Sequence, residues 1–266
     1  MLMSLGADLK YALDPVAFAS ELLGMELDPW QADVLAGEGR RDLLCCSRQS
    51  GKSTTAAILG LHQALYRPNS LCLLVSPSLR QSSELFRAVM TLRERLPNAP
   101  ELTEDNRLSM AVRGGGRVVS LPSSESTIRG YSGATLLVID EAARVPDPLY
   151  HAVTPMLATT AGRLIGMSTP FGRRGWYAEA WHDQPDWQKT RITVYDVPRI
   201  TREWIQEQRR IMPAWWFEQE FECQFKESED AVFRHEHVMA ALDPDVRPLF
   251  AETEARPAEP VEPLPL

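Results

Sequence analysis

Short apolar runs alternate with longer amphipathic segments along most of this chain. The runs are only a few residues long, are bounded by polar residues and are rich in leucine, valine and isoleucine, which predicts buried strands. They lie at residues 43–46, 71–75, 135–140 and 163–167. A further strand is predicted at 191–197, and a hairpin at 110–121 around the glycines 114–116.

The segments between these runs carry helical patterns. Residues 8–36 contain two helix-start signals, Asp14-Pro15 and Asp28-Pro29, in which an acidic residue precedes a proline. Other helices are expected at 54–66, 78–96 and 149–157. Strands that alternate with helices predict an α/β protein with a parallel sheet covered on both faces. Its ligand is expected beyond the carboxyl ends of the strands.

The chain is expected to divide into three parts. Residues 1–200 would form the core with its N-terminal helical segment, and 201–250 a small helical extension in which Pro213 starts a second helix. Tryptophans in this extension are interpreted as packing residues, with base stacking as the alternative; they are Trp204, Trp215 and Trp216. Residues 251–266 contain four prolines and four glutamates, which predicts a disordered tail.

The composition is that of an ordinary globular protein, with 266 residues, 44% hydrophobic and 24% charged. No apolar run approaches the roughly 20 residues that span a bilayer, and no secretory signal is recognisable, so no membrane association is expected. The net charge of −8 argues against a surface coated by nucleic acid, but it leaves a local contact open. Candidate phosphate contacts are Arg173, Arg174 and the hairpin tip 114–117, with solvated loops as the alternative.

Neither the four cysteines nor the five histidines have the spacing of a metal site. Cys45 and Cys46 are adjacent, and the cysteines are interpreted as small buried residues in a reducing cytoplasm. His235 and His237 are close together but lack further ligands in the sequence nearby. We therefore expect no metal held by cysteine or histidine.

Residues 46–53 (CSRQSGKS) predict a phosphate-binding loop between a strand and a helix. In such loops the backbone N–H groups and the helix N-terminus face the phosphates. Lys52 would then reach the β- and γ-phosphates, and Ser53 would hold Mg²⁺. Cys46 departs from the general pattern, which has glycine at this place. The expected cofactors are ATP and Mg²⁺.

The apolar run at 135–140 leads directly into two acids, Asp140 and Glu141. At the end of a strand beside the phosphate loop, Asp140 would hold the metal shell. Glu141 projects elsewhere and would polarise the attacking water. The alternative is that both acids only favour the start of a following helix.

Together these segments resemble the ATPase domain of the large terminase subunit of tailed bacteriophages. The matching segments, in the family's order, are Trp30-Gln31, SRQSGKST (47–54), STIRGYSGA (126–134), LLVIDEAA (136–143) and STP (168–170). The resemblance covers roughly residues 14–250. It implies a P-loop NTPase of the RecA-like, ASCE type, in which helices flank a parallel sheet.

The resemblance also implies roles for single residues. Gln31 would contact adenine, unless it is an ordinary surface glutamine. Arg48 would sense the γ-phosphate or tether neighbouring elements. Ser168 and Thr169 would report hydrolysis to the parts that grip DNA, with a proline-closed strand end as the alternative. The remaining nucleotide contacts would come from Ser47, Gln49, Ser50, Gly51 and Thr54.

Arg129 matches the arginine that terminases offer to the ATP of a neighbouring subunit. The alternatives are an arginine that binds a loop of its own chain, or one that binds DNA. The resemblance thus implies a catalytic set of Lys52, Arg48, Glu141 and Arg129. It also implies a ring of identical copies when assembled, and a monomer in isolation is compatible with this.

Large terminases usually continue into a nuclease domain, which would need about 150 further residues. Residues 251–266 cannot supply such a domain. Asp243 and Asp245 lie in a proline-punctuated stretch and are interpreted as linker, not as a metal pair. We therefore expect an ATPase without its own nuclease, in which a separate polypeptide cuts DNA or the sequence is truncated.

The implied function is a motor that couples ATP hydrolysis to movement of double-stranded DNA into a procapsid. Its partners would be DNA phosphates, a portal protein and a small terminase subunit, in the cytoplasm of a host that carries the phage or prophage. One alternative is a helicase-like or remodelling ATPase, although a helicase core ordinarily needs two such sheets. Another is a nucleotide-dependent scaffold that recruits a separate nuclease, against which the intact Lys52, Ser53, Asp140 and Glu141 argue.

Overall fold

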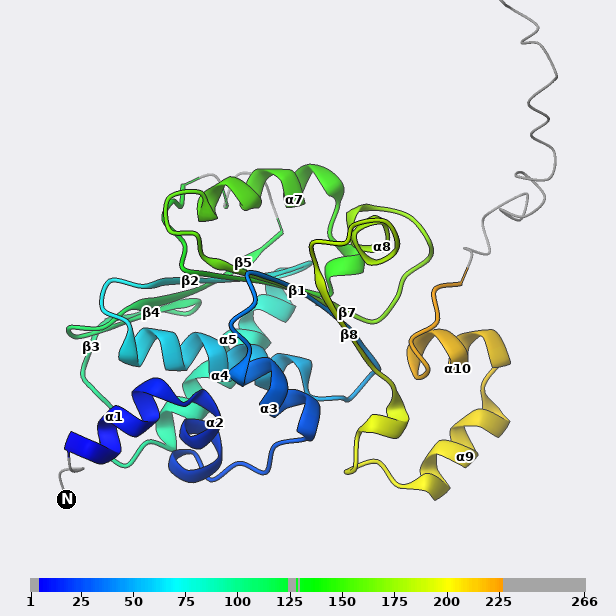
Figure 1. Ribbon diagram of the computed structural model, residues 1–266, viewed down its shortest axis with the longest axis horizontal. Helices are drawn as coiled ribbons and strands as arrows, with labels where there is room; N and C mark the ends of the chain where they lie inside the picture. Colours follow the sequence, from blue (N-terminus) through cyan, green and yellow to red (C-terminus); the bar gives the residue numbers. More distant parts are fainter. Residues whose placement is uncertain (1–4, 124–127, 129, 227–266) are drawn as a thin grey trace, which may run out of the picture. The chain divides into compact units, whose positions relative to one another are not determined.

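One sheet organises the described part of the chain. The computed structural model describes residues 5–123, 128 and 130–226, and within them eight strands pair in the order β3-β4-β5-β2-β6-β7-β1-β8 (Figure 1). The strands are β1 (Arg41–Cys46), β2 (Leu71–Ser76), β3 (Leu102–Asp105), β4 (Ser109–Val112), β5 (Arg117–Pro122), β6 (Leu136–Asp140), β7 (Arg163–Ser168) and β8 (Gln188–Ile192). All these residues belong to one unit, which extends to Lys226.

The central strands of the sheet are parallel, as the sequence predicted. Every pair from β5 through β2, β6, β7 and β1 to β8 is parallel, so the carboxyl ends of these strands meet at one edge. The hairpin of β4 and β5 is antiparallel and confirms the prediction at 110–121. Strand β3 adds an antiparallel edge that was not predicted, because its residues LTED form no apolar run.

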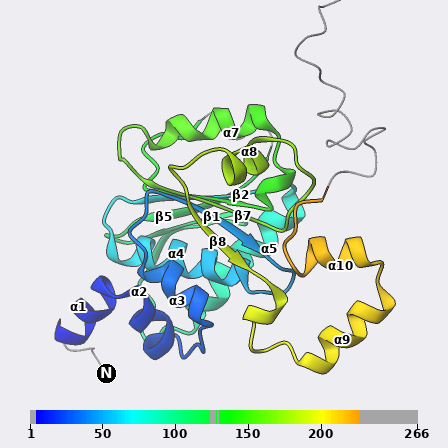
Figure 2. The same ribbon diagram turned by 45° about the vertical axis from the view of Figure 1, so that its right-hand side comes forward.

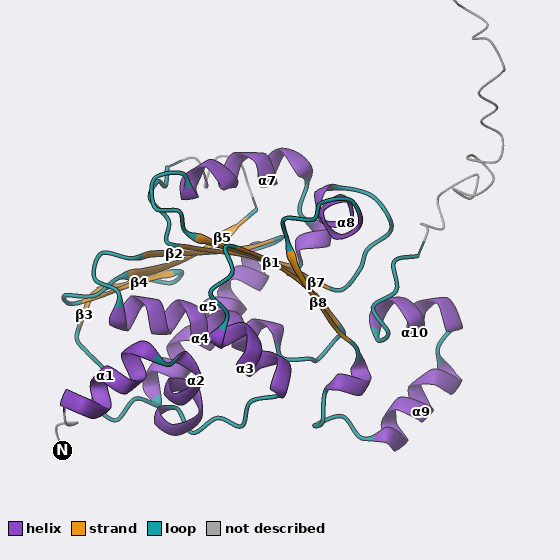
Figure 3. Cartoon of the chain, viewed as in Figure 1, coloured by secondary structure: helices purple, strands orange, loops and turns teal. Residues whose placement is uncertain are grey.

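Helices cover both faces of the sheet (Figures 1 and 3). One face carries α1 (Leu5–Leu13), α2 (Pro15–Ala17), the π-helix η1 (Phe18–Leu22), α3 (Pro29–Ala36), α4 (Lys52–Tyr66) and α5 (Leu79–Glu94). The opposite face carries α7 (Asp147–Val153) and α8 (Trp176–His182). The predicted α/β fold with helices on both sides is therefore confirmed.

Side chains of each strand alternate between two hydrophobic cores. In β1, Leu44 and Cys46 pack into the core under α4 and α5, whereas Leu43 and Cys45 pack into the core under α7 and α8. Because both faces are buried, the strand appears in the sequence as an uninterrupted apolar run and not as an alternation.

The predicted strand at 191–197 is wrong in its second half. β8 ends at Ile192, and residues Val194–Asp196 form the 3-10 helix η4. The Asp196 carboxylate accepts hydrogen bonds from the backbone N–H and the hydroxyl of Thr193, at 2.8 and 2.7 Å. This local capping turns the chain out of the sheet after Ile192.

Two further elements differ from the predictions. The helical stretch predicted at 8–36 is interrupted, since Gly24 adopts a left-handed φ of 63° and α3 begins only at Pro29. The loop predicted after β7 contains α8, which starts at Trp176 because the Asp147 carboxylate accepts its N–H at 2.7 Å. Trp176 also stacks on Tyr150, with ring centroids 4.1 Å apart. These are tertiary contacts that no local pattern announces.

After β8 the chain forms α9 (Arg202–Ile211) and α10 (Ala214–Glu220), which lie beside the edge of the sheet (Figure 2). A small core holds them together, made by Val194, Ile205, Phe217 and Phe221. The three tryptophans are 36–43% exposed, and Trp204 contacts the ring of Phe221 at 5.6 Å. The division of the chain near residue 200 stays a prediction.

Other predictions lie outside the described residues: those for His235, His237, Asp243 and Asp245 and for the tail 251–266. Among the residues that are described, no helix has the length and apolar character needed to cross a membrane. All four cysteines are free and buried, and burial raises the pKa of the Cys72 thiol to about 12.

A buried ion pair between Arg163 and Asp42 ties β7 to β1, with Nε to Oδ2 at 2.9 Å. Arg163 also donates to the carbonyl of Val34 in α3 at 2.9 Å. Replacing Arg163 by alanine would leave the Asp42 carboxylate buried and unpaired. We expect Arg163→Ala to lower the free energy of unfolding by about 3 kcal/mol in urea titrations.

The control is Arg87→Ala, which breaks the exposed pair with Glu84 (2.8 Å). Because solvent screens that pair, its loss should cost less than about 0.5 kcal/mol. Equal effects of the two variants would contradict the structural role of Arg163.

Candidate active site

The predicted phosphate loop joins β1 to α4 at the carboxyl edge of the sheet (Figure 1). Two of its residues have left-handed backbone conformations, Gln49 with φ 59° and Gly51 with φ 100°. The backbone N–H of Ser47 donates to the carbonyl of Ile192 in β8 at 2.7 Å. The loop is thus tightly folded and fixed to a neighbouring strand before the helix begins at Lys52.

Cys46 does not disturb this loop although the general pattern has glycine there. Its side chain lies fully buried in the core under α4, facing away from the turn. Burial raises the pKa of the Cys46 thiol to about 12, so the residue acts as a small neutral core group.

The loop encloses a cavity of about 310 Å³, lined by residues 48–54 and by Glu141. Lys52 is only 8% exposed. Its ammonium donates to a neutral carbonyl, that of Ser47 at 3.3 Å, and among the described residues it does not donate to a carboxylate. A buried ammonium without a carboxylate partner favours an anionic ligand in this cavity.

Buried hydroxyls beside the loop also lack partners. Within the described residues, Ser47 and Ser168 have Oγ atoms without a hydrogen bond, although both residues are fully buried. β1 and β7 pair side by side, and Ser168 lies opposite Cys45 in the register. Unpaired buried hydroxyls are costly, so the site is suited to a ligand with several acceptor oxygens.

Asp140 ends β6, which is separated from β1 by β7. Burial raises the pKa of Asp140 to about 6, with a contribution from Glu141 and an opposing one from Lys52. One carboxylate oxygen accepts the backbone N–H of Glu141 at 3.0 Å. A nearby cation stabilises the charged form of such a carboxylate, so Asp140 suits a metal ion.

Glu141 has a left-handed φ of 49°, which a non-glycine residue adopts at a cost of about 1 kcal/mol or more. This conformation redirects the chain after β6 into the 3-10 helix η2 (Ala142–Arg144). Glu141 lines the cavity, and its carboxylate is 3.9 Å from Nε of Arg144. The two acids therefore differ in environment, one deeply buried and one at the cavity.

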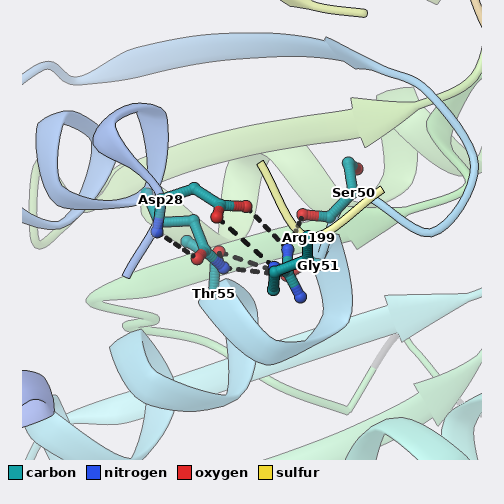
Figure 4. A network of polar contacts seen from close by, with 6 residues as sticks. Asp28, Ser50, Gly51, Thr55 and Arg199 are labelled. Atoms are coloured by element: carbon teal, nitrogen blue, oxygen red, sulfur yellow. Dashed lines mark hydrogen bonds and ion pairs between the residues drawn. The ribbon is translucent and has the colours of Figure 1, made fainter. Parts of the chain in front are cut away.

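Gln31 is not a surface residue, because only 3% of it is exposed. Its side-chain oxygen accepts the N–H of Asp28 at 3.0 Å, and its amide donates to the Gly51 carbonyl at 3.4 Å and to the Thr55 hydroxyl at 3.0 Å (Figure 4). Gln31 thus binds the loop directly. Its contact with adenine stays a prediction.

Arg48 points to α10. Its Nε lies 2.5 Å from a carboxylate oxygen of Glu220, and its backbone N–H donates to the Glu220 carbonyl at 3.0 Å. Glu220 is 1% exposed, so this carboxylate is buried against the loop. The contact of Arg48 with a phosphate stays a prediction.

The remaining predicted residues are distributed differently. Ser168 and Thr169 are buried at the end of β7, beside the loop, whereas Arg129 lies outside the described residues. Arg173 and Arg174 follow β7, but the hairpin tip 114–117 precedes β5 and lies at the opposite edge of the sheet. The structure therefore does not bring the candidate DNA contacts together.

Three partners of the loop had not been predicted, namely Asp28, Arg199 and Glu220. Asp28 was noted only as a helix start. Arg199 and Glu220 stand in segments with no motif, and their contacts with the loop exist only because β8 and α10 fold back onto it.

Larger cavities exist elsewhere. One of about 760 Å³ is lined by Arg40, Arg41, Pro155 and neighbouring residues, at the ends of the strands opposite the loop. It contains no helix N-terminus and no pair of acids, so volume alone does not make it the site.

The strand order, the loop between β1 and α4 and the acids at the end of β6 define a P-loop NTPase fold of the ASCE type. Residues 43–238 match the family described as terminase large subunit, T4-like virus type, N-terminal part. The chain therefore belongs to this terminase family.

Curated relatives agree. The chain is 29% identical over 250 residues to the terminase large subunit of Thermus phage G20c, covering 80% of this chain and 51% of that protein. It is 28% identical over 199 residues to that of Escherichia phage T5, covering 71% and 44%. The chain thus spans about half the length of the curated relatives that it matches.

Solved structures share the fold. The ATPase domain of the Thermus phage P74-26 large terminase superimposes with a TM-score of 0.68 at 25% identity, covering 80% of this chain and 100% of that one. The HK97 bacteriophage large terminase gives 0.67 at 17% identity, covering 80% and 55%. A large terminase from a thermophilic bacteriophage, in complex with ADP, gives 0.58 at 12% identity, covering 82% and 52%.

The backbone at Gly51 leaves no room for a side chain. An added Cβ would lie 2.9 Å from the Gln31 amide nitrogen and 3.2 Å from an Arg199 nitrogen, in a left-handed conformation. We expect Gly51→Ala to lower the free energy of unfolding by about 3 kcal/mol in chemical denaturation.

Gly114→Ala is the matched control, because Gly114 also has a positive φ, of 74°, but nothing lies within 4 Å of its Cβ position. Backbone strain alone should cost about 1 kcal/mol there. If both variants lost the same stability, the contacts of Gln31 and Arg199 around Gly51 would not matter.

Proposed function

We propose that this chain is the ATP-hydrolysing motor domain of a viral DNA-packaging terminase large subunit. In this proposal it couples hydrolysis to the movement of double-stranded DNA into a procapsid. The observation that carries it is the cavity shared by the 48–54 loop and Glu141, with Asp140 close behind, in a chain of the terminase family.

The donor set fits a magnesium nucleotide. The buried ammonium of Lys52 and the unpaired hydroxyls of Ser47 and Ser168 suit phosphate oxygens. Ser53 at the start of α4 and the carboxylate of Asp140 are oxygen ligands of the kind that Mg²⁺ prefers. Bound Mg-ATP would supply the phosphoryl group and the metal charge that stabilises its transfer.

The chain's own residues then have distinct tasks. Lys52 would neutralise charge on the phosphates, and Glu141 would accept a proton from the attacking water. Glu141 is 24% exposed at its side chain, so water can reach it, whereas Asp140 is 7% exposed and is better suited to hold a cation. In support, solved structures of the large terminase from the thermophilic bacteriophage contain ADP and ATP-γ-S.

The proposed partners follow from the family. They are double-stranded DNA bound through its phosphates, a portal protein, a small terminase subunit and, for cleavage, a separate nuclease. The proposed state is a ring of copies in the host cytoplasm. Contacts with DNA would be weak and salt-dependent, because no base-reading element is present in the described residues.

Replacing Glu141 by glutamine should abolish turnover but not binding. Since a general base contributes about 10²–10⁴-fold, kcat of Glu141→Gln should fall by at least about 100-fold while the Kd for ATP stays within about threefold. Lys52→Ala should lose binding as well. Both quantities are measurable by phosphate release and calorimetry.

Glu38→Gln serves as the control, because Glu38 is an exposed glutamate outside the cavity. It should behave as the unaltered chain does. Unchanged turnover in Glu141→Gln would remove the support for the proposed ATPase site.

Arg129 is proposed to act on the nucleotide of a neighbouring copy. A mixture of Arg129→Ala and Glu141→Gln proteins should then hydrolyse ATP faster than either alone, because each supplies what the other lacks. An arginine of this kind contributes about 10³–10⁵ in rate, so even partial recovery is measurable.

A mixture of Glu141→Gln with Lys52→Ala is the control for this experiment and should remain inactive. No recovery in the first mixture would contradict action between subunits.

A further inference from the structure

Arg199 links three parts of the molecule at the phosphate loop (Figure 4). It lies between η4 and α9, in the segment that follows β8. Its Nη2 donates to the Asp28 carboxylate at 2.6 Å and to the Ser50 carbonyl at 2.9 Å, and its Nε donates to Asp28 at 3.3 Å. One guanidinium therefore joins the start of α3 to the backbone of the loop.

This contact fixes the direction of a single peptide group. The Ser50 carbonyl and the Gly51 N–H belong to the same peptide unit, and no peptide bond among the described residues is cis. In a trans peptide the C=O and N–H bonds point in opposite directions. Because Arg199 holds the Ser50 oxygen, the Gly51 N–H is directed away from Arg199, and Gly51 lines the cavity.

Gln31 supports the next peptide group from the same side. Its amide donates to the Gly51 carbonyl at 3.4 Å, and Asp28, which grips Arg199, also donates its N–H to Gln31 at 3.0 Å. Both side chains lie so close to Gly51 that its Cβ position is blocked. The carbonyls of residues 50 and 51 are thus both held behind the loop, away from a ligand in front of it.

The two partners of this pair have different exposure. The Asp28 side chain is 5% exposed, whereas that of Arg199 is 52% exposed. The buried carboxylate therefore fixes a guanidinium that would otherwise move freely in solvent. Only the planar fork of arginine can contact a carboxylate and a carbonyl together; the single ammonium of lysine cannot match this geometry.

We propose that Arg199, held by Asp28, is a positioning residue that aims the Gly51 N–H at the phosphates of the nucleotide. The proposal rests on the nucleotide-binding function proposed above and adds a residue from the β8–α9 segment to it. Arg199 acts through the backbone of the loop and not on the reacting atoms.

The experiment measures Kd for Mg-ATP and for Mg-tripolyphosphate, by calorimetry on the full chain. Arg199→Ala and Asp28→Asn should each weaken both ligands about tenfold, as expected when one hydrogen bond to a charged group is impaired. Turnover at saturating ATP should change less than about threefold, since the same contact serves the ground state and the transition state. Arg199→Lys should resemble Arg199→Ala.

Arg202→Ala is the matched control, an exposed arginine at the start of α9, and should leave both Kd values unchanged. The double variant Arg199→Ala with Asp28→Asn leaves no unpaired buried carboxylate, which protects the fold. It should bind ATP no more weakly than either single variant, because both changes remove the same contact. Additive losses would overturn the shared action of the pair.

Other outcomes separate the alternatives. A loss for ATP with tripolyphosphate unaffected would place Arg199 on the base or ribose and overturn positioning. Normal binding by Arg199→Lys would reduce its role to charge and would overturn it too. If the unaltered chain binds ATP but Arg199→Ala binds equally well, only this inference fails. If the unaltered chain binds neither ligand, the proposed function fails and this inference with it.

Discussion

The conformation of the turn between Cys46 and Lys52 is the constraint on which the site depends. A loop that offers backbone N–H groups to an anion must bind its own carbonyl groups on the other side, or they would face the ligand. Here the carbonyl partners come from outside the loop: Gln31 from α3 and Arg199 from the segment after β8. The turn is therefore a product of tertiary structure, although its sequence is contiguous.

The parallel sheet explains how distant residues reach this turn. Parallel strands bring their carboxyl ends to one edge, so the ends of β1, β6 and β7 meet there. Because β7 lies between β1 and β6, the Ser168 hydroxyl stands between the loop and Asp140. The burial that raises the pKa of Asp140 to about 6 is a consequence of this central position, and a cation there would compensate for it.

Much of this arrangement could be predicted from local pattern. The apolar runs predicted β1, β2, β6 and β7 to within one or two residues, because strands buried on both faces leave a continuous signal. The loop and the acids of β6 were evident since the chemistry needs particular residue types at fixed spacing. β3 and β8 were less accessible, because edge strands are polar and are defined by their partners. Asp28, Arg199 and Glu220 were missed for the same reason: each contact joins residues that are remote in sequence.

The C-terminal helices are tied to the loop by contacts of unequal strength. The bond from the Ser47 N–H to Ile192 and that from Arg199 to the Ser50 carbonyl use neutral acceptors, which water can replace at small cost. The pair of Arg48 and Glu220 is different, since Glu220 is buried and its charge would be left unpaired if Arg48 alone turned to another anion. Such a loss costs several kcal/mol, as for any buried ion that loses its partner. Arg48 can therefore exchange Glu220 for a phosphate only if α10 also moves far enough for the carboxylate to reach water.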